Sequence, residues 1–130
     1  MPETDPHKSQ ASSVLRVAIV EDRPEIRDGL SQIINGAAGF ACIGAYGTME
    51  LALAEIGKLP AARSPLEVIL PDVVLIDIGL PGMSGIEGIR RLKEHHPQLL
   101  MLVLTVFEDD QRIFEALCAG ASGYLLKLST

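Results

Sequence analysis

The sequence has few aromatic residues, no tryptophan and no excess of positive charge. Three Phe and two Tyr among 130 residues leave too few rings for binding single-stranded nucleic acid by base stacking. The formal net charge of -6 argues against a chain that holds nucleic acid through its phosphates, because such a chain needs a basic face. With so few rings, the core must be built from aliphatic side chains.

Cysteines and long apolar runs are scarce as well. Cys42 and Cys118 show no metal-ligand spacing and each lies in an apolar stretch, so we interpret both as small buried hydrophobic residues in a reducing compartment. Residues 1–13 are polar and lack the apolar segment of a signal peptide, and no apolar run approaches the ~20 residues of a membrane span. We therefore expect a cytoplasmic protein with no membrane partner.

The length and hydrophobic content fit one compact domain. A hydrophobic fraction of 48% is typical of globular proteins, and 130 residues correspond to about one domain. We read residues 1–13 as a disordered tail and residues 14–130 as a single domain without internal repeats.

Short apolar runs alternate with segments of helical periodicity. The runs predict strands at residues 15–20, 40–46, 72–77, 99–104 and 124–126. Helices are predicted between them: from Pro24 to Gly36, from a Thr48 cap to about Gly57, from a Ser84–Glu87 capping box onward, and over about 109–119. Nearly continuous apolar strands separated by helices predict an α/β fold whose parallel sheet is covered on both faces.

The helical periodicity also predicts which side chains face the core. For the first, third and fourth helices, the expected inward residues are Ile26, Leu30, Ile33 and Ile34, then Ile86, Ile89 and Leu92, then Ile113, Phe114 and Leu117.

Polar residues with complementary chemistry follow four of the five predicted strands. They are Glu21 and Asp22 after the first strand, Asp77 at the end of the third, Thr105 after the fourth and Lys127 after the fifth. Ligands of open parallel sheets bind beyond the carboxyl ends of the strands, so these side chains should converge. Like charges held close together repel unless a cation binds them, and Mg²⁺ prefers carboxylate oxygens. The sequence therefore predicts a magnesium site there.

These residues resemble the receiver domain of two-component response regulators. The resemblance runs from about Leu15 to Lys127 and includes the Glu21-Asp22 pair, the LIDIGLPGMSG segment around Asp77, Thr105 and the GYLLK segment ending at Lys127. The segments around Asp77 and before Lys127 are most similar to the subfamily that carries a LuxR/FixJ-type DNA-binding domain after the receiver.

The resemblance implies a flavodoxin-like, doubly wound five-stranded parallel sheet in the order 2-1-3-4-5. The family follows its fifth strand with a helix that we expect this chain to lack, because only three residues follow Lys127. Losing such a helix uncovers several hundred Å² of apolar surface, so we expect a second copy to cover it in a homodimer. No DNA-binding domain is seen in this chain, and we expect it to bind no nucleic acid directly.

The resemblance also assigns roles around the acidic site. It implies that Asp77 accepts a phosphoryl group from a sensor histidine kinase, and that the domain then switches an output, in this subfamily transcription. Asp22 and Asp77 would hold Mg²⁺, with Glu21 acting directly or through water and the backbone carbonyl of Gly79 as a further ligand.

Three further residues receive roles from the same resemblance. Lys127 would pair with Asp77 at rest and with a phosphoryl oxygen afterwards. The hydroxyl of Thr105 would donate to another phosphoryl oxygen, and Tyr124 would turn inward as Thr105 moves. The expected activity is a switch with at most self-phosphorylation and self-dephosphorylation, not that of an enzyme.

Two alternatives remain open. A Mg²⁺-dependent phosphatase with an aspartate nucleophile would need a second Asp as general acid, and that position is Gly79 here. A phosphorylation-independent pseudo-receiver would be expected to lack the acceptor or the lysine, whereas Asp77 and Lys127 are both present.

Overall fold

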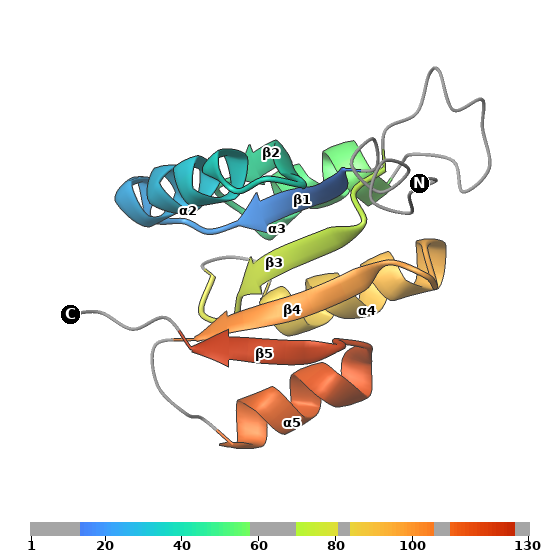
Figure 1. Ribbon diagram of the computed structural model, residues 1–130. Helices are drawn as coiled ribbons and strands as arrows, with labels where there is room; N and C mark the ends of the chain where they lie inside the picture. The colour runs from blue at the N-terminus through green and yellow to red at the C-terminus, as the bar shows by residue number, and fades with distance from the viewer. Residues whose placement is uncertain (1–13, 58–69, 81–83, 106–109, 127–130) are drawn as a thin grey trace, which may run out of the picture.

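The computed structural model describes residues 14–57, 70–80, 84–105 and 110–126, which form one twisted five-stranded sheet (Figure 1). All neighbouring strands are parallel, and their order is β2-β1-β3-β4-β5. The strands are β1 (Leu15–Val20), β2 (Phe40–Tyr46), β3 (Val73–Asp77), β4 (Leu100–Thr105) and β5 (Gly123–Leu126). The predicted order 2-1-3-4-5 is confirmed.

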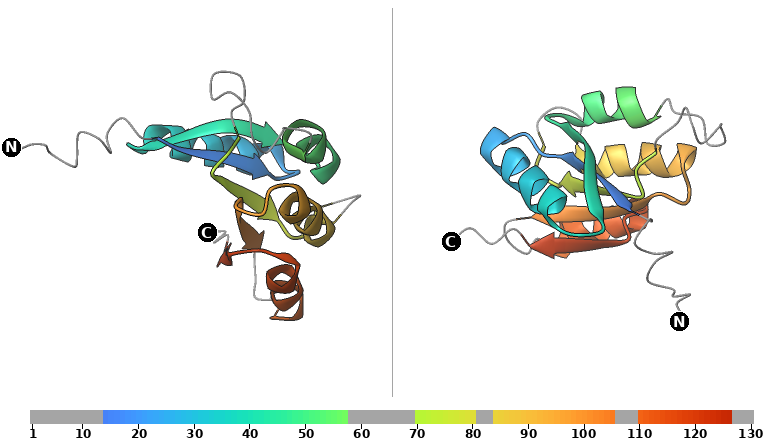
Figure 2. Two further views of the ribbon diagram at one scale, coloured as in Figure 1. Left: turned by 90° about the vertical axis from the view of Figure 1, so that its right-hand side faces the viewer. Right: turned by 45° about the horizontal axis from the view of Figure 1, so that its top comes forward.

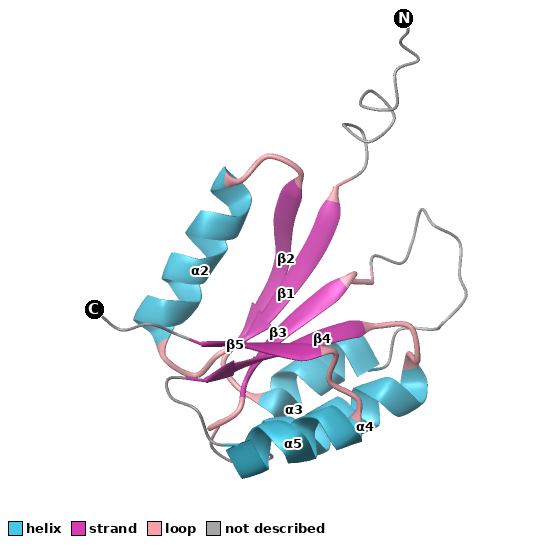
Figure 3. Cartoon of the chain, turned by 60° about the horizontal axis from the view of Figure 1, so that its bottom comes forward, coloured by secondary structure: helices cyan, strands magenta, loops and turns pink. Residues whose placement is uncertain are grey.

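Helices cover both faces of the sheet. They are α2 (Pro24–Gly36), α3 (Met49–Ala52) with its π-helical continuation η1 (Leu53–Gly57), α4 (Gly85–His95) and α5 (Asp110–Ala119). Helix α2 lies on one face, and α3, α4 and α5 lie together on the other (Figures 2 and 3). This is the predicted doubly wound α/β fold. No helix in the described part of the chain has both the length and the apolar character of a membrane span.

The core is split into two layers by the sheet, because alternate residues of each strand point to opposite faces. The larger layer joins strand residues such as Ile76 and Met101 to Ile89 and Leu92 of α4. The smaller layer lies under α2 and is built mainly from Val17, Ile19, Leu75 and Leu104. The aliphatic core expected from the composition is therefore present.

Helix starts follow their predicted caps. Thr48 Oγ1 accepts a hydrogen bond from the Leu51 amide and Ser84 Oγ accepts one from the Glu87 amide, both at 3.1 Å. The carboxylate of Glu87 accepts hydrogen bonds from Arg90 and Arg91 on its own helix. The hydrogen bond from Arg91 is the main reason that the pKa of Glu87 lies below its ordinary value.

Two predicted helix faces are partly wrong. Ile33 of α2 is 70% exposed and Phe114 of α5 is 66% exposed, and Leu117 is also exposed. Helix α2 packs through Leu30 and Ile34, while α5 buries Ile113 and Ala116. The buried face of each helix is narrower than its number of apolar residues indicates. On α5 the small side chain of Ala116 is part of that buried face.

Two other expectations need correction. Cys118 is exposed and Cys42 only half-buried, so neither is the buried residue that we predicted, although both are free thiols. The helix expected from Thr48 to Gly57 divides into α3 and η1. The buried ring of His96, just after α4, lies with Nε2 3.1 Å from the carbonyl of Ile56 in η1, which ties this turn to α4.

Strand β2 forms one edge of the sheet and carries no charged residue. Its pairing with β1 shifts register between Val17 and Ala18, so Ile43 is an additional residue that forms a bulge. The side-chain oxygen of Asn35, on α2, accepts a hydrogen bond from the Cys42 amide at 2.8 Å.

The face under α2 is less fully covered toward the other edge. Leu100 is 50% exposed, and it shares this face with Leu102 and Leu104 because residues alternate along β4. Leu125 of β5, the partner of Leu104 in the strand register, is 47% exposed. The prediction of a missing final helix falls on residues 127–130, which lie outside the described residues.

Candidate functional site

The acidic pair follows β1 at the carboxyl edge of the sheet. Val20 pairs with Ile76, so β1 and β3 end at the same level and place Glu21 and Asp22 beside Asp77. Glu21 is fully buried, its amide donates to the carbonyl of Tyr46 at 2.9 Å, and its carboxylate accepts from the Arg23 amide at 3.2 Å. Asp22 is half-buried.

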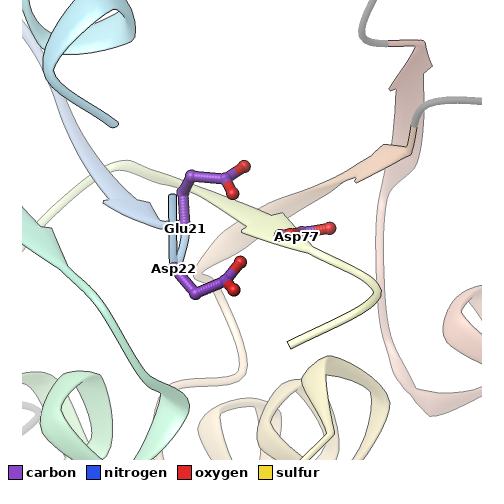
Figure 4. Close-up of side chains that lie close together, drawn as sticks. All are labelled: Glu21, Asp22 and Asp77. Atoms are coloured by element: carbon purple, nitrogen blue, oxygen red, sulfur yellow. The ribbon is translucent and has the colours of Figure 1, made fainter. Parts of the chain in front are cut away.

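The three carboxylates form one cluster. One oxygen from each of Glu21, Asp22 and Asp77 can be chosen so that all three atoms lie within 4.8 Å of one another. Figure 4 shows the side chains of Glu21 and Asp22 extending from the end of β1 on the side of Asp77. The convergence that the strand ends predict is therefore present for all three acids.

This donor set fits a hard divalent cation. Three carboxylate oxygens at such short separations repel one another, and a bound cation removes the repulsion. Mg²⁺ takes oxygen ligands and retains several waters, so a partly open set of carboxylates suits it. Glu21, Asp22 and Asp77 are the residues that would hold it.

Asp77 is buried next to a glycine. The residue is 8% exposed, and its Oδ1 accepts a hydrogen bond from the Gly79 amide at 3.1 Å. A Cβ atom added at Gly79 would lie 3.9 Å from the same oxygen. A side chain at position 79 would thus stand beside the Asp77 carboxylate, and glycine leaves that approach open.

Thr105 ends β4 next to the acidic cluster. Asp77 pairs with Leu104 across the β3–β4 ladder, so Thr105 follows one position beyond, and it is buried. Tyr124 is paired with Val103 and is partly exposed on β5. Lys127, the predicted ammonium of the site, lies outside the described residues.

Two arginines near the site were missed by the sequence analysis. Arg27 of α2 donates from Nη1 to the carbonyl of Glu21 at 2.9 Å, and Arg112 of α5 donates from Nη2 to the carbonyl of Ile78 at 2.7 Å. No motif marks either residue, since an arginine on an amphipathic helix reads as part of a solvated face.

Comparison with known proteins places this geometry in a family. The model of the response regulator receiver domain matches residues 17–130. Among curated proteins, the chain is 34% identical over 114 residues to the DNA-binding transcriptional activator DevR/DosR of Mycobacterium tuberculosis, a match that covers 88% of this chain and 48% of that protein. It is 32% identical to the response regulator GacA of Pseudomonas viridiflava, with coverage of 88% and 49%. The chain spans about half the length of these relatives.

Solved structures share the fold of this chain and about a quarter of its sequence. A LuxR-family two-component response regulator from Aurantimonas sp. SI85-9A1 superposes with a TM-score of 0.75 at 28% identity, covering 90% of this chain and 76% of that one. The chemotaxis protein CheY4 of Vibrio cholerae gives a TM-score of 0.73 at 25% identity, with coverage of 91% and 90%. The cluster of three acids, the strand order and the family match over nearly the whole described chain lead to one assignment: this chain belongs to the response regulator receiver domain family.

Proposed function

We propose that the chain is a phosphoacceptor switch in which Asp77 receives a phosphoryl group from a phosphohistidine of a sensor histidine kinase. The observation that carries the proposal is the cluster of Asp77 with Glu21 and Asp22, with buried Thr105 on the next strand. A carboxylate oxygen of Asp77 attacks phosphorus and the phosphorus–nitrogen bond breaks, with its electron pair going to the ring nitrogen. An acyl phosphate results, and the phosphohistidine ring, protonated on its other nitrogen, leaves as a neutral imidazole. A carboxylate is a weak nucleophile, so the domain acts mainly by positioning groups and neutralising charge.

The acidic cluster supports a requirement for Mg²⁺. Bound there, the ion would neutralise charge between the carboxylates and the incoming phosphoryl oxygens. In this proposal Asp22 and Asp77 hold it, Glu21 does so directly or through water, and the carbonyl of Gly79 adds a ligand. The Gly79 amide, which already donates to Asp77 Oδ1, keeps the acceptor carboxylate oriented.

The response to phosphorylation is proposed for residues of the adjacent strands. The Thr105 hydroxyl donates to a phosphoryl oxygen after transfer, Tyr124 turns inward in response, and Lys127 pairs with the phosphoryl group. Phosphorylation would then bias a two-state loop. Because the LuxR-family regulator from Aurantimonas and the activator DevR/DosR are similar to this chain, we propose control of a transcriptional output in the cytoplasm.

We also propose that the chain forms a homodimer. Half-exposed Leu100 and Leu125 lie on one face of neighbouring strands, beyond the strands that α2 covers. An apolar sheet face of this kind gains free energy when another surface removes it from water. A second copy is the proposed partner for this face.

The substitution Asp77→Asn tests the acceptor role. With acetyl phosphate and Mg²⁺, the wild-type chain should acquire one phosphoryl group and release acetate, and the Asn variant should acquire none while keeping its fold. Asp28→Asn, which changes an exposed acid on α2, is the matched control and should be phosphorylated like the wild type. Intact-mass spectrometry measures the adduct, and circular dichroism checks the fold.

The same experiment separates the alternative functions. One stable adduct per chain supports the switch, whereas continuous release of inorganic phosphate over many turnovers indicates a phosphatase. A folded wild-type chain that forms no adduct indicates a phosphorylation-independent module. An equal adduct on the Asp77→Asn variant contradicts the assignment of the acceptor.

A further inference from the structure

Arg112 links helix α5 to the backbone immediately after Asp77. Its Nη2 donates to the carbonyl oxygen of Ile78 at 2.7 Å, and its side chain is half-buried. This is a short, charge-assisted hydrogen bond between elements that are 34 residues apart in the sequence. It reaches the backbone one residue after the proposed phosphoacceptor.

The carbonyl of Ile78 and the amide of Gly79 belong to the same peptide unit. That amide donates to Asp77 Oδ1 at 3.1 Å. A peptide unit is planar, so an interaction that fixes the direction of its C=O also fixes the direction of its N–H. The guanidinium of Arg112 and the carboxylate of Asp77 therefore hold opposite ends of one rigid plane.

Two physical effects make this arrangement sensitive to Arg112. A cation at the carbonyl polarises the amide, which strengthens the hydrogen bond that its N–H donates. The plane is also free to rotate at Gly79, because glycine imposes few steric limits on its backbone angles. On the other side, the Ile78 amide is held by the Leu104 carbonyl at 3.1 Å, so the Ile78–Gly79 unit is the adjustable part of this loop.

We propose that Arg112 is a positioning residue for phosphoryl transfer, which acts through the Ile78–Gly79 peptide to orient the carboxylate of Asp77. The proposal rests on the proposed function of Asp77 as phosphoacceptor. It also makes α5 a part of the acceptor site, so that a shift of this helix alters the reactivity of Asp77.

Three variants of the full chain test this role: Arg112→Ala, Arg112→Lys and, as a matched control on the same helix, Gln111→Ala. The phosphorylation rate constant is measured with acetyl phosphate at saturating Mg²⁺, and the Gly79 amide is followed by NMR. Arg112→Ala should lower the rate constant about tenfold, the scale of one hydrogen bond to a charged group. It should also shift the Gly79 amide resonance and speed its hydrogen exchange. Arg112→Lys, which keeps a cationic donor, should recover most of both, and Gln111→Ala should change neither.

Each other outcome is decisive. If Arg112→Ala lowers the melting temperature but leaves the rate constant and the Gly79 resonance unchanged, Arg112 is merely structural and the proposal is overturned. If Arg112→Ala does not fold, Arg112→Met replaces it, because methionine fills similar space but donates no hydrogen bond to the Ile78 carbonyl. A lowered rate constant together with a shifted Gly79 resonance in that variant supports the proposal, and a wild-type rate constant or a wild-type Gly79 resonance overturns it. A wild-type chain that takes no phosphoryl group refutes the function of Asp77, while the Gly79 resonance still reports whether Arg112 orients the peptide.

Discussion

Asp22 and Glu21 are adjacent acids in different surroundings. Glu21 is fully buried and its carboxylate accepts a hydrogen bond from the Arg23 amide, whereas Asp22 is only half-buried. We expect Asp22→Ala to lower Mg²⁺ affinity about tenfold or more, because it removes one anionic oxygen ligand from the proposed site. Isothermal titration with MgCl₂ measures the change, and Asp28→Ala serves as a control for the loss of one negative charge. Unchanged affinity in the Asp22 variant would remove this residue from the metal site.

Tyr46 leads us to predict that the stability of the domain falls at alkaline pH. Burial of its phenol, reinforced by Glu55 and Cys42, raises its pKa above the ordinary value of 10.0. The unfolded chain therefore loses this proton first as the pH rises. The stability that Tyr46 contributes is fully present below pH 10.0 and is lost as the pH rises through the folded-state pKa.

Urea unfolding at neutral pH and above the ordinary tyrosine pKa measures this effect. The wild type should lose more free energy of unfolding between the two conditions than Tyr46→Phe, which has no phenol to ionise at this position. Tyr124→Phe is the control and should keep the full alkaline loss. Equal losses in the wild type and in Tyr46→Phe would show that Tyr46 does not titrate differently in the two states.

At the scale of elements, α3 and α4 meet through a glycine. The side chain of buried Met49 occupies the space that a Cβ atom at Gly88 would take, whereas a Cβ atom at Gly29 on α2 would meet nothing within 4 Å. We expect Gly88→Ala to destabilise the domain by about 1–3 kcal/mol through overpacking, less any gain in helix propensity. Gly29→Ala should instead stabilise it by up to about 1 kcal/mol. Urea unfolding measures the free energy of unfolding of both variants. If both substitutions stabilise the domain, Met49 moves aside at little cost.

Elements were predicted best where the local pattern alone decides them. The bounds of β1 and β2 match the expectation, because apolar runs between turn residues define a strand without reference to its neighbours. The inward faces of α2 and α5 were harder, since Ile33 and Phe114 are as apolar as the residues that are buried. Which of them faces the sheet depends on the rotation of each helix about its own axis. The periodicity of the apolar residues alone does not determine that rotation.

The sequence predicted one part of the candidate site, the acids, and missed another, the contact from Arg112. Three acids could be brought together in advance because parallel strands end at a common edge, and the structure places all three there. The contact from Arg112 to Ile78 joins a helix to a loop across the fold through a backbone carbonyl, which every residue possesses. No sequence pattern predicts such a contact.

At the scale of the whole molecule, the proposed dimer has a direct test. Sedimentation velocity at micromolar concentration should show association that increases with concentration. Leu125→Lys should weaken it, because a charge would enter the apolar face of β5. Ile33→Lys, on an exposed position of α2, is the matched control and should associate like the wild type. A wild-type chain that remains monomeric would contradict the proposed dimer.

Among the described strands, β2 has a neighbour on one side only, and this has a consequence for how copies of the domain avoid one another. An uncharged edge strand of seven residues is a template onto which strands of other molecules can add, and such addition leads toward aggregation. Growth of that kind needs evenly spaced N–H and C=O groups along a regular strand. The bulge at Ile43 breaks this spacing, and Asn35 already engages the Cys42 amide. The Asn35 side chain and the bulge residue Ile43 thus oppose the addition of strands from other molecules. In other proteins, charged residues on the edge strand often have this role.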